Sequence, residues 1–151
     1  MKPVKTRANY KKAYYNYTIT GRNSNINFNS LVARMHSSPA RINQNIYRVI
    51  NKQLVNKLLT NGYLNDAYPS SFTLNKNFAE RLHSIGKNYK NTRFLVLGRG
   101  TYPAINSTRS YRSGFPYEKE VTIAPGRFVL KGFTNDGHLR VVYFPKYPIF
   151  K

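Results

Sequence analysis

A short segment in the C-terminal half of the chain strongly constrains the fold. Residues 117–123 alternate in polarity, and Pro125 and Gly126 follow them. Such alternation is typical of a half-buried β-strand, and a Pro-Gly pair marks the turn that ends it. Side chains two residues apart point to the same face of a strand. We therefore expect Glu118 and Glu120 to project together from one strand.

This pair of glutamates is unusual in a chain with so few acidic residues. The 151 residues include 25 Lys and Arg but only 5 Asp and Glu, for a formal net charge of +20. Two like charges on one face repel each other, so the pair is a candidate for chemistry. The strong positive field favours polyanionic partners, such as nucleic acid, an anionic membrane surface, an acidic protein or a phosphate-bearing ligand.

The remaining composition narrows the class of protein. The length and a hydrophobic content of 40% fit one globular domain. The sequence has no cysteine, and its three histidines are dispersed, so we expect no disulfide and no metal site. No apolar run reaches the ~18–20 residues of a membrane helix, and the N-terminus lacks the apolar core of a signal peptide. We expect a protein without a membrane partner that is cytoplasmic where it is made.

Two regions are expected along the chain. Residues 1–22 hold six lysines and arginines and four tyrosines, and we interpret them as a basic, Tyr-rich N-terminal arm. Cations mixed with tyrosines suit contact with the backbone and bases of nucleic acid, although such tyrosines also pack on their own domain. Residues 23–151 are expected to form the domain itself.

The hydrophobic pattern of residues 23–151 predicts helices first and strands afterwards. A helix is predicted from Ser38-Pro39 through the apolar residues between 42 and 59, ending before Asn61-Gly62, and a second over 76–85. Residues 65–71 are expected to be a loop, and 134–137 a hairpin turn. The predicted strands are 27–35, 71–74, 93–97, 102–105, 117–123, 128–130 and 139–144. This order indicates an α+β domain built on antiparallel sheet.

Residues 115–128 resemble the glutamate motif of mono-ADP-ribosyltransferases of the Arg-Ser-Glu class. In that family a Glu-x-Glu pair begins a strand that runs through apolar residues to Pro-Gly, as Glu118 to Gly126 do here. The family also has an arginine at the end of its first core strand, matched by Arg34. A Ser-Thr-Ser strand leads into a helix, and Ser71-Phe72-Thr73 matches it. The resemblance covers about residues 28–144, in the family's order.

The arginine and serine motifs depart from the family pattern. Thr73 stands where the last serine is expected. Ala33 precedes Arg34 where the family frequently has an aromatic residue, and Met35 follows where it frequently has glycine. Arg41 and Arg99 therefore remain alternatives to Arg34, although Arg99 follows the hydroxyl motif and breaks the order of the motifs.

The resemblance implies a fold of two small, packed, mainly antiparallel β-sheets with helices toward the N-terminal half. It also implies an enzyme that takes NAD+ as co-substrate and releases nicotinamide, leaving an oxocarbenium-like ribose. By this resemblance Glu120 stabilises that ribose, and Glu118 orients and deprotonates the acceptor. Arg34 would pair with the NAD+ pyrophosphate.

Further site residues follow from the same resemblance. Ser71 would bond Glu120 and fix its rotamer, and both Ser71 and Thr73 would line the NAD+ site. Three aromatic residues before the glutamates, Tyr111, Phe115 and Tyr117, would face the acceptor and the nicotinamide.

Three functions remain open. A glutamate at the first motif position goes, in this family, with transfer to a protein arginine, which we favour. The charge of +20 favours an ADP-ribosyltransferase of nucleic acid or ribonucleoprotein, or a basic nucleic-acid-binding protein without chemistry. The small size is typical of a phage-encoded modifier or the toxin part of a bacterial effector, delivered into a target cell, and leaves room for an immunity or inhibitor protein as partner.

Overall fold

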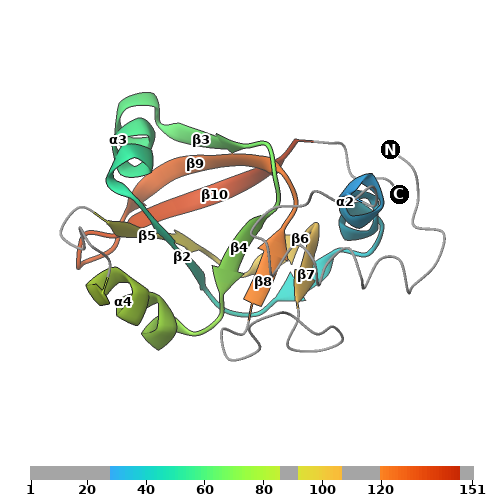
Figure 1. The fold of residues 1–151 in the computed structure, drawn as a ribbon, viewed down its shortest axis with the longest axis horizontal. Helices are drawn as coiled ribbons and strands as arrows, with labels where there is room; N and C mark the ends of the chain where they lie inside the picture. The colour runs from blue at the N-terminus through green and yellow to red at the C-terminus, as the bar shows by residue number, and fades with distance from the viewer. Residues whose placement is uncertain (1–27, 86–91, 107–119, 147–151) are drawn as a thin grey trace.

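The computed structural model describes residues 28–85, 92–106 and 120–146 (Figure 1). Its helices are α2 (Phe28–Ser37), α3 (Lys52–Asn61) and α4 (Lys76–Ile85). The strands are β1 (Ala40–Ile42), β2 (Ile46–Ile50), β3 (Tyr63–Asp66), β4 (Ser70–Thr73), β5 (Arg93–Leu97), β6 (Gly100–Tyr102), β7 (Ala104–Asn106), β8 (Glu120–Ile123), β9 (Gly126–Phe133) and β10 (Leu139–Pro145).

Most of these strands belong to one large sheet. Its order is β3-β9-β10-β5-β2-β4-β8-β7, and β1 and β6 form a separate two-stranded sheet. Among the described residues the pairings are antiparallel except that of β10 with β5. In Figure 1 the β3-β9-β10 part crosses the β4-β8-β7 part at a steep angle. The α+β class, the mainly antiparallel sheets and the helices in the N-terminal half are confirmed.

One face of the large sheet encloses the main core. Strands from both ends of the sheet contribute to it, with Leu64 from β3 and Ala104 from β7, so the sheet curls around the core. Ile42 of β1 joins the same cluster and ties the small sheet to the large one. The remaining members are Ile46, Ile50, Leu58, Phe72, Leu95, Leu97, Val121, Ile123, Phe128, Leu139 and Val141.

The opposite face of the sheet is covered in part by α4. The side chains of β5 alternate, so that Leu95 and Leu97 face the main core while Phe94 and Val96 pack with Ala79 of α4. The other two helices lie elsewhere: α3 packs on β3 and β9, and α2 on β7 (Figure 1). We call the face that carries Phe94 and Val96 the outer face.

The strand predicted over residues 27–35 is wrong, because residues 28–37 form α2. Phe28, Leu31, Val32 and Met35 recur at three- and four-residue intervals, the period of a helix with one apolar side. Leu31, Val32 and Met35 are buried. Arg34 therefore lies on a helix rather than at the end of a strand.

The long helix predicted from residue 39 is wrong in its first half. Residues 40–42 and 46–50 are strands, and α3 begins only at Lys52, where the Asn51 side chain accepts a hydrogen bond from the Leu54 amide at 2.9 Å. The predicted end is confirmed: Gly62 adopts a left-handed conformation with φ 82° and its N–H bonds the Leu58 carbonyl.

Other local predictions are mixed. Helix α4 and the turn at 134–137, which joins β9 to β10 and includes Gly137 at φ 84°, are confirmed. The loop predicted over 65–71 is wrong, since β3 extends to Asp66 and β4 starts at Ser70. The strand predicted over 102–105 is split between β6 and β7. Of the strand predicted over 117–123, the described residues form β8.

Candidate active site

The end of β4 and the start of β8 place hydroxyl and carboxyl side chains side by side. The two strands are antiparallel, with Thr73 opposite Glu120 and Ser71 opposite Thr122. Directly opposed residues share a face, and so do residues two apart. These four side chains therefore lie together on the outer face, where Glu120 is 4% exposed.

Ser71 holds the carboxyl group of Glu120 directly. Its Oγ donates a hydrogen bond of 2.5 Å to Glu120 Oε2, between diagonal neighbours on the two strands. This bond restrains the rotamer of a buried side chain. Thr73 Oγ1 accepts a hydrogen bond of 3.0 Å from the Asn75 amide. This bond fixes the Thr73 hydroxyl on the strand position opposite Glu120.

The middle residue of the Ser71-Phe72-Thr73 segment faces the other way. Phe72 is 2% exposed and packs in the main core, 5.5 Å from the ring of Phe128 between centroids. Because strand side chains alternate, the residue between two site hydroxyls belongs to the core and does not contact the site. A phenylalanine at this position is therefore compatible with a hydroxyl pair on the outer face.

A row of side chains extends from Glu120 across five strands. Glu120 is opposite Thr73, Thr73 opposite Tyr47 of β2, and Tyr47 opposite Val96 of β5. Val96 is in turn the register partner of Arg140 on β10. With strands about 4.8 Å apart, the row is about 19 Å long. It begins at a carboxylate and ends at a guanidinium.

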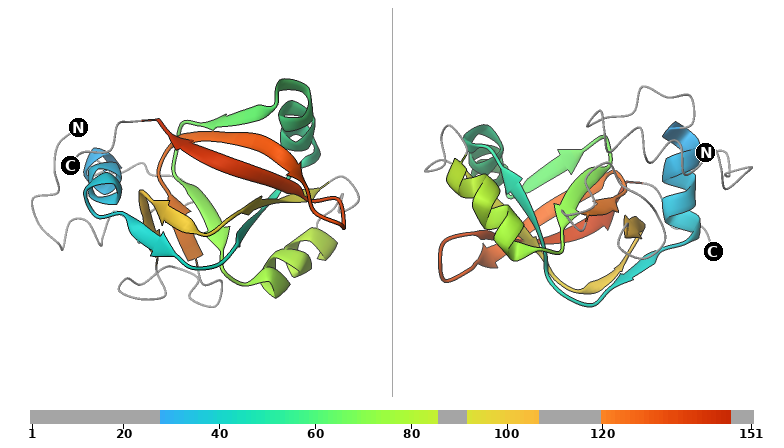
Figure 2. Two further views of the ribbon diagram at one scale, coloured as in Figure 1. Left: turned by 180° about the vertical axis from the view of Figure 1, so that it is seen from behind. Right: turned by 60° about the horizontal axis from the view of Figure 1, so that its bottom comes forward.

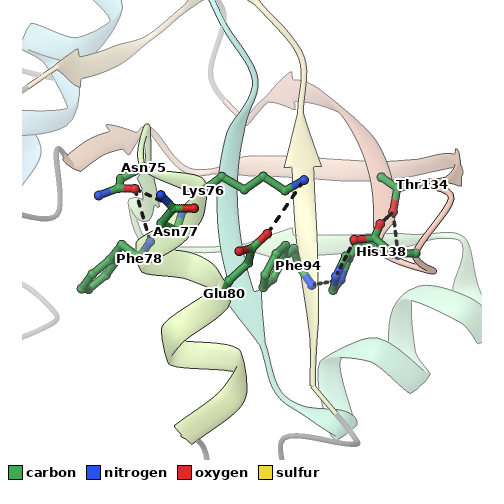
Figure 3. Close-up of polar contacts among 9 residues, drawn as sticks. Asn75, Lys76, Asn77, Phe78, Glu80, Phe94, Thr134 and His138 are labelled. Atoms are coloured by element: carbon green, nitrogen blue, oxygen red, sulfur yellow. Dashed lines mark hydrogen bonds and ion pairs between the residues drawn. The ribbon is translucent and has the colours of Figure 1, made fainter.

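A pocket of about 510 Å³ occupies the Arg140 end of this row. It is lined by Tyr47, Phe94 and Val96 from the sheet, by Lys76 from the start of α4, and by His138 before β10. In Figure 3, Lys76 extends from α4 across β2. The pocket thus combines aromatic walls with two cations and the carboxylate of Asp136. Its volume falls in the usual range for small-molecule sites.

His138 forms a rigid part of the pocket wall. Its ring stacks on Phe94 with centroids 3.9 Å apart, and its Nδ1 accepts a hydrogen bond of 3.0 Å from the Phe94 amide (Figure 3). Nδ1 is therefore unprotonated. Burial lowers the pKa of His138 below its ordinary value, although Asp136 nearby opposes the shift. A neutral imidazole with its Nε2–H near Asp136 is the result.

Comparisons with solved structures identify the architecture. C3stau2 from S. aureus, solved with NAD, has a TM-score of 0.63 and 15% identity, over 95% of this chain and 90% of that chain. The ADP-ribosyltransferase Vis from Vibrio splendidus, in complex with agmatine, has a TM-score of 0.54 and 18% identity over 95% and 78%. C3larvin toxin, an ADP-ribosyltransferase from Paenibacillus larvae, has a TM-score of 0.52 and 12% identity over 93% and 90%.

The chain has the ADP-ribosyltransferase fold. At the level of sequence, no protein-family model and no curated protein matches it. Within the described residues, no helix is long and apolar enough to cross a membrane.

In this ADP-ribosyltransferase fold the predicted arginine and its two alternatives lie in three different segments of the chain. Arg34 is half-buried on α2, the helix that packs on β7 beside β8. Arg41 on β1 and Arg99 between β5 and β6 are both exposed. The role of Arg34 toward NAD+ stays a prediction. Glu118, Tyr111, Phe115 and Tyr117 lie outside the described residues.

Arg48 is a further arginine that the sequence reasoning did not consider. It lies in the middle of β2, the strand next to β4, and its Nη1 is 2.5 Å from Asp66 Oδ2. Asp66 also accepts a hydrogen bond from Ser70. A signal was present, because Tyr47 supplies the aromatic residue that the family pattern frequently has before its arginine. By register, Arg48 faces Leu95 and the core side of the sheet.

Proposed function

We propose that this protein is an ADP-ribosyltransferase that moves ADP-ribose from NAD+ to a guanidinium group, most simply that of a protein arginine. The observation that carries the proposal is the hydrogen bond from Ser71 to the buried Glu120, on the face where the hydroxyls of β4 and β8 converge. The ADP-ribosyltransferase fold supports the reaction class. The neighbour Vis was solved with agmatine, a small guanidino compound, which supports the acceptor class.

In the proposed reaction the bond between nicotinamide and ribose C1′ breaks, and the bonding electrons leave with nicotinamide. Glu120, oriented by Ser71, stabilises the positive charge that develops on the ribose. An acceptor nitrogen then bonds C1′ and loses a proton. A guanidinium is protonated in water and so a poor nucleophile, and we assign its deprotonation to Glu118.

We further propose that NAD+ lies along the row from Glu120 to Arg140. The nicotinamide ribose would sit at Glu120 and Thr73, and the remainder would extend past Tyr47 toward the pocket. There Lys76 and Arg140 offer positive charge to the phosphates, and the aromatic wall offers a stacking surface. A length of about 19 Å accommodates both halves of a dinucleotide. Arg34 remains the alternative phosphate partner.

The first experiment measures both NAD+ cleavage and transfer. The protein is incubated with NAD+ labelled in the adenylate, with agmatine or with cell lysate. Glu120→Gln should abolish nicotinamide release and transfer alike, because the charge that stabilises the ribose is lost. Glu118→Gln should abolish transfer while sparing part of the hydrolysis. Full transfer by Glu120→Gln would refute the assignment.

The charge of +20 favours a second candidate, transfer to nucleic acid. The same lysate reaction decides between the acceptors. Label that is removed by protease and resists RNase indicates a protein acceptor, and the converse indicates RNA. A role as a toxin or effector follows from the same proposal, since C3larvin is named a toxin. Delivery into a target cell and an inhibitor protein remain expectations.

A further inference from the structure

The described helices leave the outer face of the β3-β9-β10 part of the sheet uncovered. Seen from behind in Figure 2 (left), β9 and β10 cross the front, and none of the described helices lies over them. Strand register places one set of side chains together there. Asn65 and Phe144 both oppose Arg127, and Tyr63 and Val142 both oppose Val129. We call this surface, formed by Tyr63, Asn65, Arg127, Val129, Val142 and Phe144, the β3-β9-β10 face.

On this face a guanidinium lies over one aromatic ring, and a second ring is exposed. The Arg127 guanidinium carbon lies 4.2 Å from the centroid of the Tyr63 ring, and its Nε donates to Asn65 Oδ1 at 2.9 Å. These contacts hold the guanidinium against the Tyr63 ring while Arg127 stays exposed. Phe144, opposite Arg127, is 54% exposed. An exposed aromatic ring beside a fixed guanidinium offers flat surfaces on which a planar group can stack.

A groove of about 680 Å³ runs along the end of the face. Arg127, Val129 and Phe144 line it, together with Lys146 and Asp66. The carboxylate of Asp66 is engaged by Arg48 and Ser70, which offsets its charge. The groove therefore presents cations and an aromatic ring to solvent, in a chain whose net charge is +20.

We propose that the β3-β9-β10 face binds single-stranded nucleic acid. Bases would stack on Phe144 and on the Arg127 guanidinium, whose other side is covered by Tyr63. Arg127 and Lys146 would contact phosphates. Aromatic and cationic side chains on an open antiparallel sheet are suited to unpaired bases, because every base has a stacking surface. This binding needs no NAD+, so it stands or falls separately from the proposed transferase activity.

The experiment is fluorescence anisotropy of the full chain with a labelled oligouridine of about a dozen nucleotides, without NAD+. Phe144→Ala should raise Kd about tenfold or more, the loss expected for one stacked base. Phe144→Tyr, which keeps the ring, should bind within about twofold of the parent. Arg127→Gln should reduce the slope of log Kd against log salt by about 0.7, the value for one phosphate contact on a single strand.

Matched controls separate this face from the general positive field. Phe133→Ala removes an aromatic ring that is 56% exposed at the far end of β9, and Lys57→Gln removes an exposed cation on α3. Both should leave Kd within about twofold. Thermal unfolding of each variant checks that the fold is intact. Oligodeoxyuridine in a second arm distinguishes DNA from RNA, and either result supports the proposal.

Several outcomes would overturn the proposal. Equal Kd for Phe144→Ala and Phe133→Ala would remove the stacking role. If Phe144→Ala lost affinity for heparin, which has no bases, by the same factor as for oligouridine, the face would be only a charged surface. Loss of binding in Lys11→Gln/Lys12→Gln, with none in Phe144→Ala, would move the site to the N-terminal segment. A dimer that Phe144→Ala converts to a monomer would make the face a contact between two copies of this chain.

Discussion

Two adjacent serines on β4 allow a sharp test of the site. Ser71 donates to Glu120 on the outer face, while Ser70 donates to Asp66 on the core side. Each serine therefore supports one carboxylate, and Ser71→Ala and Ser70→Ala remove the same atom from neighbouring residues. If Glu120 carries the chemistry, the two variants should differ strongly in activity.

The magnitude follows from the bond that is lost. A hydrogen bond to a charged group contributes about 1.5–3 kcal/mol, and Glu120 is 4% exposed, so little water can replace the donor. Where the bond holds the carboxylate in its reactive rotamer, its loss raises the activation free energy by the same amount. Each ~1.4 kcal/mol of activation free energy lowers the rate tenfold. Ser71→Ala should therefore lower kcat for NAD+ hydrolysis about 10- to 100-fold, with little change in KM.

The assay is nicotinamide release at saturating NAD+, at a temperature where urea titration shows both variants folded. Ser70→Ala should retain kcat within about twofold. Equal losses of kcat in the two serine variants would refute the positioning role.

Further perturbations test the fold and its ionisation. Gly126→Ala should destabilise the fold by about 1–3 kcal/mol, because the added Cβ would lie 2.5 Å from a backbone carbonyl oxygen of β10. Gly132→Ala should not have this effect, because its Cβ would have no neighbour within 4 Å. Urea unfolding of the two variants compares these losses. Arg48→Met should cost about 1–3 kcal/mol by leaving the half-buried Asp66 carboxylate without its guanidinium, and adding Asp66→Asn should recover part of the loss. The folded-state pKa of His138 is below the unfolded value of 6.5. The stabilisation of the fold by the neutral imidazole is therefore complete above pH 6.5 and is lost as the pH falls below it. Unfolding free energies at pH 7.5 and 5.5 should show this loss, and His138→Gln should reduce it.

Much of the C-terminal half could be predicted because its signals are local. The apolar run of β5 and the turn at 134–137 each depend on residues close in sequence. The position of Glu120 on a strand followed from the same kind of pattern. Its contact with Ser71 spans 49 residues, and it was predicted from the family resemblance rather than from periodicity.

The N-terminal half was misread because one spacing fits two structures. Ile46, Val49 and Ile50 recur at helical intervals, yet they are β-branched and two of them pack in the core of a sheet. The β-branched side chains, more than their spacing, distinguish a strand from a helix here. Because residues 46–50 are predicted as part of a helix, Arg48 is not considered as the arginine of the first core strand, and the role of Arg34 stays a prediction.

The register of β4 against β8 explains how a small domain can hold a reactive carboxylate in place. Phe72 and Val121 oppose each other in the main core at 2% and 0% exposure, between the pairs that face the site. A slip of β4 by one residue against β8 would turn Phe72 outward and point Ser71 into the core, away from Glu120. Exposing the phenylalanine alone would cost about 1.5–3 kcal/mol. The residue that departs most from the family's Ser-Thr-Ser pattern, Phe72, is thus a residue that keeps Ser71 against Glu120.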